Sequence, residues 1–146
     1  AGDAFAVFSF TIPGIPLIYS GQEAGLNKRL LFFEKDEINW SDLEKQKFYE
    51  KLVGLKTGNK ALWNDGAGGD FIISETTSGN AFCFVRKKGK SKVLAVFNFS
   101  SEESSVGFAL PEGGTFINYF SGEKEKLDTQ LMVEMPAWGY KVYIQN

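Results

Sequence analysis

Residues 11–25 read TIPGIPLIYSGQEAG and contain a short apolar run between prolines and glycines. The apolar run from Ile15 to Tyr19 has no apolar/polar alternation, is bracketed by proline and glycine, and is too short for a helix. Such a run predicts a strand buried on both faces, which is typical of parallel sheets. Every later apolar segment has the pattern of a hairpin-connected antiparallel strand, so this strand has no parallel neighbour in the chain.

The residues on either side of this run predict a helix before it and a tight loop after it. Residues 3–11, DAFAVFSFT, are apolar on nearly all sides, which predicts the end of a helix packed between a sheet and other helices. Pro13 ends this helix, and Pro16 is tolerated only at the first residue of a strand or at a bulge. Gly21 and Gly25 then permit a tight loop.

A second helix is predicted after residues 27–39, which mix basic, acidic and aromatic residues without periodicity. The tetrapeptide SDLE at residues 41–44 has the spacing of a capping box, so we expect Ser41 to be the N-cap and the helix to begin at Asp42. We expect Gly58 to end it. Its apolar face is formed by residues at near-helical spacing, namely Leu43, Phe48, Leu52 and Leu55.

These segments resemble the end of the catalytic barrel in the α-amylase family, glycoside hydrolase family 13. PGIPLIY at residues 13–19 followed by GQEAG at 21–25 is similar to the eighth barrel strand and the loop after it. Two prolines and three glycines at fixed offsets around a buried strand seldom coincide by chance. The resemblance implies that the chain is the C-terminal portion of a longer enzyme, with the last strand and helix of a (β/α)8 barrel and then the family's all-β domain. The similarity continues through FEKD at 33–36, INW at 38–40, FYEKL at 48–52 and NKAL at 59–62.

A turn-rich stretch at residues 64–70, NDGAGGD, separates the helical region from a region where the hydrophobic period falls from about 3.6 residues to about 2. We expect two parts, a C-terminal fragment of the catalytic barrel at residues 1–62 and an all-β C-terminal sandwich at residues 63–146. Short strands separated by turns predict an antiparallel Greek-key β-sandwich, so the fold class is mostly β, preceded by an α/β remnant of a TIM barrel. The predicted strands are 71–75, 81–87, 92–99, 105–110, 115–120, 131–135 and 140–145.

Composition excludes several classes of function. The net charge is -2, charges of both signs are interspersed and no polybasic run is present, which leaves no footprint for nucleic acid or a membrane surface. The chain has no histidine, so Ser-His-Asp triads and histidine metal sites are excluded. Its single cysteine, Cys83, excludes an internal disulfide and lies in a strand pattern where a buried, inert thiol is expected. No targeting segment can be read, and the resemblance slightly favours an extracytoplasmic protein, secreted or periplasmic.

The resemblance implies a parent enzyme that hydrolyses α-1,4-glucans such as starch, glycogen and maltooligosaccharides. Its retaining mechanism uses two carboxyl groups roughly 5 Å apart. In the family, the nucleophilic aspartate, the acid/base glutamate and a third aspartate lie on barrel strands four, five and seven, all before the position of Ala1. We therefore carry over no catalytic residue and expect this chain to be structural and inactive by itself. Calcium is possible in the parent enzyme, but this fragment offers no evident ligands, and no cofactor or metal is predicted for it.

Three residues in or next to the loop after the predicted strand are candidates for binding substrate. A barrel enzyme keeps its chemistry at the carboxyl ends of its strands, which is where Tyr19, Gln22 and Glu23 fall. We expect Tyr19 and Gln22 to line the rim of the substrate cleft in the whole enzyme. Glu23 could have a catalytic role, but no second carboxyl has a reason to face it, so we favour a carboxylate that accepts backbone N–H bonds and holds the loop.

The other candidates have structural explanations that we favour. An exposed Trp40, Trp63 or Trp138 could stack on a sugar ring. We expect instead that Trp40 packs on the second helix, Trp63 seals the joint and Trp138 closes one end of the sandwich. The charge runs RKKGK at residues 86–90 and EKEK at residues 123–126 fit solvated hairpin turns.

Two expectations concern partners. The alternative to a structural domain is a non-catalytic carbohydrate-binding or interaction module, with residues 70–146 as its working part. Without its barrel, segment 1–62 exposes both faces of residues 15–19 and the apolar side of the second helix. We therefore expect this segment to rearrange, become disordered or self-associate while the sandwich stays folded.

Overall fold

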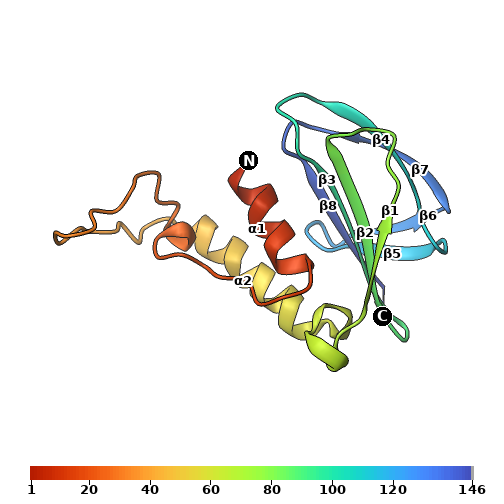
Figure 1. Cartoon of the computed structure of the whole chain (residues 1–146), viewed down its shortest axis with the longest axis horizontal. Helices are drawn as coiled ribbons and strands as arrows, with labels where there is room; N and C mark the ends of the chain where they lie inside the picture. The colour runs from red at the N-terminus through yellow and green to blue at the C-terminus, as the bar shows by residue number, and fades with distance from the viewer. Residues whose placement is uncertain (146) are drawn as a thin grey trace.

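A computed structural model of the chain describes residues 1–145 and contains helices followed by an antiparallel β-sandwich (Figure 1). None of the helices in this part of the chain is both long and apolar enough to cross a bilayer. The helical elements are α1 (Gly2–Thr11), η1 (Gln22–Ala24), α2 (Leu43–Gly58), η2 (Lys60–Leu62) and η3 (Asp65–Ala67). The strands are β1 (Asp70–Ser74), β2 (Ala81–Lys88), β3 (Ser91–Asn98), β4 (Ser104–Ala109), β5 (Gly114–Asn118), β6 (Lys124–Leu127), β7 (Gln130–Met135) and β8 (Tyr140–Gln145).

The strands form two sheets that pack face to face. One sheet has the order β1-β2-β3-β8-β5-β6, and β4 pairs with β7 in the other. Every pairing between these strands is antiparallel. Strand β8 lies between β3 and β5, so strands distant in sequence become neighbours, as Greek-key connections require.

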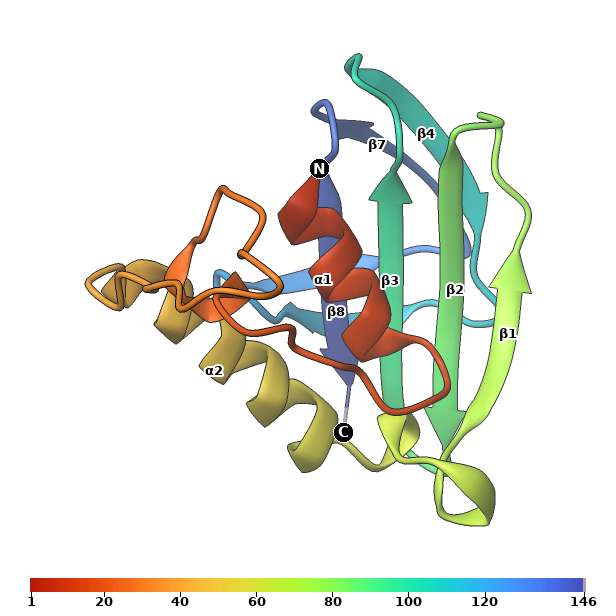
Figure 2. The same ribbon diagram turned by 60° about the vertical axis from the view of Figure 1, so that its left-hand side comes forward.

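Strand β3 is at the centre of the molecule, with the helices on one side and the second sheet on the other. Figure 2 shows α1 lying across β3 and β8. Side chains alternate along β3, so Val93 and Phe97 contribute to the core under the helices, whereas Leu94 and Val96 contribute to the core under β4 and β7. All four are fully buried, so β3 is a central strand covered on both faces.

The two helices share one apolar core with the large sheet. Val7 of α1 and Leu52 of α2 are buried in the same cluster as Phe84 of β2 and Phe97 of β3. Burying each large side chain contributes roughly 1.5–3 kcal/mol. Both helices therefore keep their structure on the sheet, so the expected rearrangement or disorder of segment 1–62 is wrong for α1 and α2. Self-association of the segment stays a prediction.

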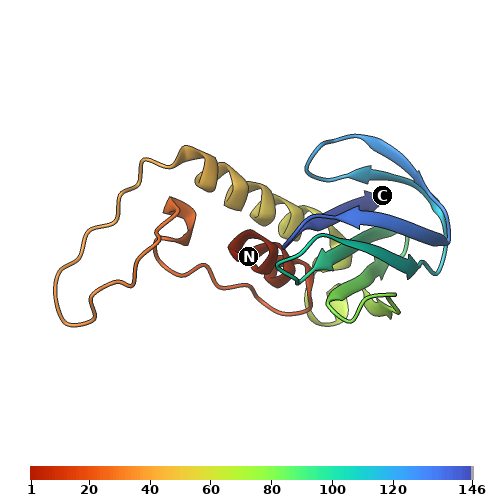
Figure 3. The ribbon, with the colours of Figure 1, turned by 90° about the horizontal axis from the view of Figure 1, so that it is seen from above.

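Residues 15–19 do not form the predicted strand. They are extended but unpaired, and Ile15, Leu17 and Tyr19 are 88%, 82% and 65% exposed. Strand conformation depends on neighbours that accept and donate the ladder hydrogen bonds, and residues 1–145 provide no parallel strand for this segment. The α/β remnant is thus reduced to its helices, and the chain between η1 and α2 projects away from the layers (Figures 1 and 3).

Helix α2 begins one residue later than predicted, with a different cap. Asp42 is the N-cap, and its Oδ1 accepts a hydrogen bond from the Lys45 backbone N–H at 3.0 Å. The carboxylate at this position satisfies one of the free N–H groups of the first turn and lies at the positive end of the helix dipole. The predicted capping box with Ser41 as N-cap is therefore wrong, whereas Gly58 is the last helical residue, as expected.

Two charge runs also differ from the prediction. Residues 124–127 form β6, a strand at the edge of the large sheet, rather than a hairpin turn. Arg86 lies inside β2 and is only 2% exposed, so it is not part of a solvated loop tip. Its Nη2 donates to the carbonyls of Trp63 and Gly69, both at 3.2 Å, and thereby ties the joint between α2 and β1 to the sheet.

Candidate functional site

The loop that follows residues 15–19 is fixed by one side chain and two glycines. Gln22 Oε1 accepts a hydrogen bond from the Tyr19 backbone N–H at 2.8 Å. Gly21 and Gly25 flank η1 with φ of 95° and 67°, backbone values that residues other than glycine rarely adopt. A Cβ atom added at Gly25 would also lie 2.7 Å from Asp42 Oδ2, the cap of α2. The loop is therefore packed tightly on the start of α2, as the two glycines predict.

The three predicted binding residues lie together on this loop, but their environments differ. The Tyr19 side chain is exposed, whereas the Gln22 amide oxygen is turned back into the loop. Glu23 is half-buried, and its Oε2 is enclosed without a hydrogen-bond partner among residues 1–145. The expectation that Glu23 holds the loop through backbone N–H groups is therefore wrong, because Gln22 does so.

A cleft of about 710 Å³ lies beside the loop. The loop contributes Gln22 and Asn27, and the helices contribute Asp3, Lys45 and Tyr49. Trp138 comes from the β7–β8 turn and Tyr140 from the start of β8. These residues come from both ends of the chain, so no spacing in the sequence indicates the cleft. Within residues 1–145 there is no group of three or more Asp, Glu, His or Cys residues that could hold a metal ion.

The three tryptophans have different roles. Trp40 is half-exposed, and its carbonyl accepts a hydrogen bond from Gln46 of α2 at 3.0 Å. Trp63 lies at the joint, as predicted, where its indole N–H donates to the Thr57 carbonyl at 2.9 Å. Trp138 is in the left-handed region with φ of 54°, which for a bulky residue costs roughly 1–3 kcal/mol. It lines the cleft rather than closing one end of the sandwich core.

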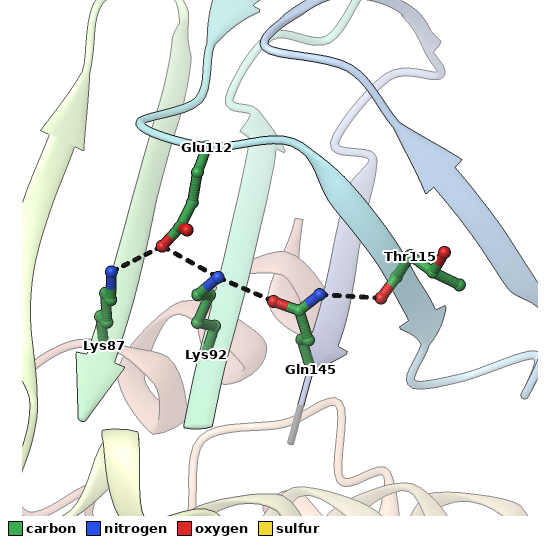
Figure 4. Close-up of polar contacts among 5 residues, drawn as sticks. All are labelled: Lys87, Lys92, Glu112, Thr115 and Gln145. Carbon is green, nitrogen blue, oxygen red and sulfur yellow. Dashed lines mark hydrogen bonds and ion pairs between the residues drawn. The ribbon is translucent and has the colours of Figure 1, made fainter. Parts of the chain in front are cut away.

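A polar cluster at the opposite end of the large sheet acts as a structural clamp (Figure 4). Glu112, in the β4–β5 turn, accepts from Lys87 Nζ at 2.5 Å and from Lys92 Nζ at 2.9 Å. These hydrogen bonds and the two positive charges lower the pKa of Glu112 to about 2. Lys92 also donates to Gln145 at 2.8 Å, and Gln145 donates to the Thr115 carbonyl at 3.1 Å. The cluster therefore connects β2, β3, β5 and β8 to the turn.

Burial shifts the pKa of two groups outside the loop. Cys83 is fully buried between the sheets, and burial raises the pKa of its thiol to about 12, so the inert thiol predicted from the strand pattern is confirmed. Lys56 of α2 donates to the Ile12 carbonyl at 3.1 Å. Burial and, to a smaller extent, the charge of Arg86 lower the pKa of Lys56 to about 8. This pair of cations belongs to the joint between the helices and the sheet.

Known relatives match the chain along nearly its whole length. It is 31% identical over 147 residues to a cyclomaltodextrinase from Thermoanaerobacter pseudethanolicus, covering 95% of this chain and 22% of the relative. It is 30% identical over 130 residues to the alpha-amylase MalA from Haloarcula japonica, covering 84% of this chain and 18% of the relative. The chain thus spans about a fifth of the length of these relatives.

Solved structures share the fold. The maltogenic α-amylase AmyB from Thermotoga neapolitana superimposes with a TM-score of 0.80 at 18% identity, covering 97% of this chain and 35% of that one. The α-amylase from Geobacillus thermoleovorans, solved with acarbose, gives a TM-score of 0.73 at 20% identity, covering 99% of this chain and 33% of that one. The chain therefore corresponds to the C-terminal region of enzymes of the α-amylase family, glycoside hydrolase family 13. Within it, residues 74–142 match the model of the maltogenic amylase C-terminal domain.

Proposed function

We propose that this chain is the C-terminal part of an α-amylase-type glycosidase that hydrolyses α-1,4-glucans such as starch, glycogen and maltooligosaccharides by the retaining two-carboxylate mechanism. The observation that carries the proposal is the segment at residues 15–19. It has the motif of the last barrel strand, yet it is extended, unpaired and exposed at Ile15, Leu17 and Tyr19. Such apolar faces need covering, and a barrel preceding the chain would supply the neighbouring strands.

In this proposal residues 1–62 are the end of the catalytic barrel, and residues 63–146 are the sandwich domain. The sandwich has a structural role, because its large sheet buries the apolar faces of α1 and α2. Because the sheet holds both helices in place, it also limits where residues 15–19, which lie between them, can sit. These residues would therefore pair with the neighbouring barrel strands in a single register. The catalytic aspartates and glutamate belong to earlier barrel strands, and this chain alone hydrolyses nothing.

The loop residues Tyr19, Gln22 and Glu23 form the part of the substrate rim that this chain contributes. Tyr19 is 65% exposed, and its ring can pack on a sugar. Glu23 has one enclosed oxygen without a partner, which a donor from the preceding barrel would satisfy. Relatives with the same fold have been crystallised with acarbose and with maltose, which supports α-glucan as the ligand class.

The test compares this chain with the protein encoded by the complete reading frame. Both are purified and incubated with soluble starch, and the release of reducing sugar is measured. We expect release by the longer protein and none by the 146-residue chain. Hydrolysis by the chain alone, or a correctly folded longer protein that leaves starch intact, overturns the proposal. Tyr19→Ala in the longer protein should raise KM, and unchanged KM and kcat would remove Tyr19 from the substrate rim.

A further inference from the structure

The cleft beside the Tyr19–Gly25 loop has the size of a small-molecule site. Its volume of about 710 Å³ falls within the range of roughly 300–1,000 Å³ that such sites occupy. Its walls come from Ala1 and the first turn of α1, the η1 loop, the first half of α2, the β7–β8 turn and the start of β8. Figure 2 shows the β7–β8 turn beside the N-terminal end of α1. The cleft is therefore a property of the assembled fold and not of one loop.

Trp138 is held in the wall of this cleft by a rigid turn. Its backbone N–H donates to the Ser100 carbonyl at 2.9 Å, and the buried Asn98 side chain donates to the Pro136 carbonyl at 3.0 Å. These bonds keep Trp138 at φ of 54°, a conformation that a bulky residue adopts only when its surroundings enforce it. Strain of this kind is frequent at binding sites. The indole also lies against the Phe5 ring, with centroids 6.1 Å apart, so it lines the cleft in a fixed position.

The cleft also offers hydrogen-bonding groups that the protein itself does not use. The hydroxyls of Tyr49 and Tyr140 have no hydrogen-bond partner among residues 1–145. Burial, followed by the negative charge of Asp3, raises the pKa of both phenols, so they remain protonated donors at neutral pH. Gln22 accepts the Tyr19 N–H with its Oε1, which leaves its Nε2 available as a donor. A ligand rich in hydroxyl groups would pair with all three.

The charges in the cleft favour an uncharged ligand. Asp3 and Lys45 form an ion pair on its wall, so the two opposite charges largely offset each other there. An anion would find Lys45 already neutralised, and a wholly apolar ligand would leave the two tyrosine hydroxyls unpaired. A hexose has an apolar ring face that stacks on an indole, and hydroxyls that exchange hydrogen bonds with phenol and amide groups.

We propose that this cleft binds a short α-1,4-linked gluco-oligosaccharide, with Trp138 as the stacking surface and Tyr49, Tyr140 and Gln22 as hydrogen-bonding groups. The choice of an uncharged sugar follows from the cleft itself. The choice of an α-glucan rests on the proposed function of the chain. Binding here requires no catalytic carboxylate, so it can be measured on this chain.

The test is isothermal titration calorimetry of the 146-residue chain with maltohexaose, and with cellohexaose as the β-linked probe. Trp138→Gly removes the indole but suits the positive φ, so the turn is retained. Tyr140→Phe removes only a hydroxyl. Trp40→Ala is the matched control, because Trp40 is half-exposed and does not line the cleft. Circular dichroism establishes that each variant has the native secondary structure.

We expect maltohexaose to bind the wild-type chain more tightly than cellohexaose does. Trp138→Gly should weaken maltohexaose binding about tenfold or more, as loss of aromatic stacking does. Tyr140→Phe should weaken it roughly two- to tenfold, and Trp40→Ala less than about twofold. Absence of binding by the wild-type chain, or equal binding by a folded Trp138→Gly variant, overturns the proposal. Starch hydrolysis by the longer protein is measured separately, so loss of hydrolysis with binding retained would overturn the proposed function alone.

Discussion

Leu52→Ala tests whether the helices and the sandwich form one cooperative unit. Leu52 is fully buried in the core that α2 shares with β2 and β3, where Phe84 and Phe97 are also fully buried. Truncating a buried leucine to alanine costs about 2–5 kcal/mol, because the transfer free energy is lost and a cavity remains. For a protein of this size each kcal/mol lowers Tm by about 2–4 °C. A cost of about 3 kcal/mol therefore predicts a Tm lower by about 10 °C.

The assay is thermal unfolding followed by circular dichroism at a helix-sensitive and at a β-sensitive wavelength. We expect both signals to shift together in Leu52→Ala, since the substitution weakens a core that contains helix and sheet residues alike. Val53→Ala is the control. The Val53 side chain, next to Leu52 in the sequence of α2, is 42% exposed, so its truncation should change stability by less than about 0.5 kcal/mol. Loss of the helical signal at lower temperature with an unchanged β transition would refute the shared core.

Two further predictions concern single polar contacts. Asp42→Ala should lower the free energy of unfolding, measured in urea, by about 1 kcal/mol, because Asp42 caps α2. Ser41→Ala is the control and should leave that free energy unchanged. The reverse result would restore Ser41 as the cap. Glu112 has a folded-state pKa of about 2, below its ordinary value of 4.5, so its ion pairs stabilise the protein above that ordinary value and are lost as the pH falls from 4.5 toward 2. Glu112→Gln should therefore have a lower Tm at pH 7 and a flatter Tm profile below pH 4.5, and parallel profiles for the two proteins would count against the clamp.

The local pattern of apolar residues and turns is sufficient to predict most strands of the sandwich. Alternating side chains between turns predict β2, β3 and β8 closely, because each strand is buried on at least one face. Strand β6 has the sequence KEKL, and its charged residues show no apolar alternation. It lies at an edge of the sheet, where charged side chains are tolerated and discourage further pairing. Its pairing with β5 comes from the hairpin and not from its own composition.

Tertiary context explains what sequence could not predict. Residues 15–19 have strand propensity but no neighbours within the described chain, so they stay unpaired. Arg86 lies within the predicted strand 81–87, but its basic run indicates a solvated side chain, whereas in the fold it is the buried donor to the Trp63 and Gly69 carbonyls. The loop of Gln22 and Glu23 is local and could be anticipated from its glycines. The cleft at Trp138 depends on contacts between opposite ends of the chain and could not.

Amide hydrogen exchange at residues 15–19 addresses most directly whether this segment belongs to a barrel. In the 146-residue chain the amides of residues 15, 17 and 18 lie outside any helix or sheet, so they should exchange nearly as fast as an unfolded peptide, while those of β3 are protected. The Tyr19 amide is left out, because it donates to Gln22 Oε1 in the chain alone. In the protein encoded by the complete reading frame, the same amides should be protected to a degree similar to β3, Pro16 having no amide hydrogen to report. Equally fast exchange of residues 15, 17 and 18 in both proteins would contradict a barrel strand at this position.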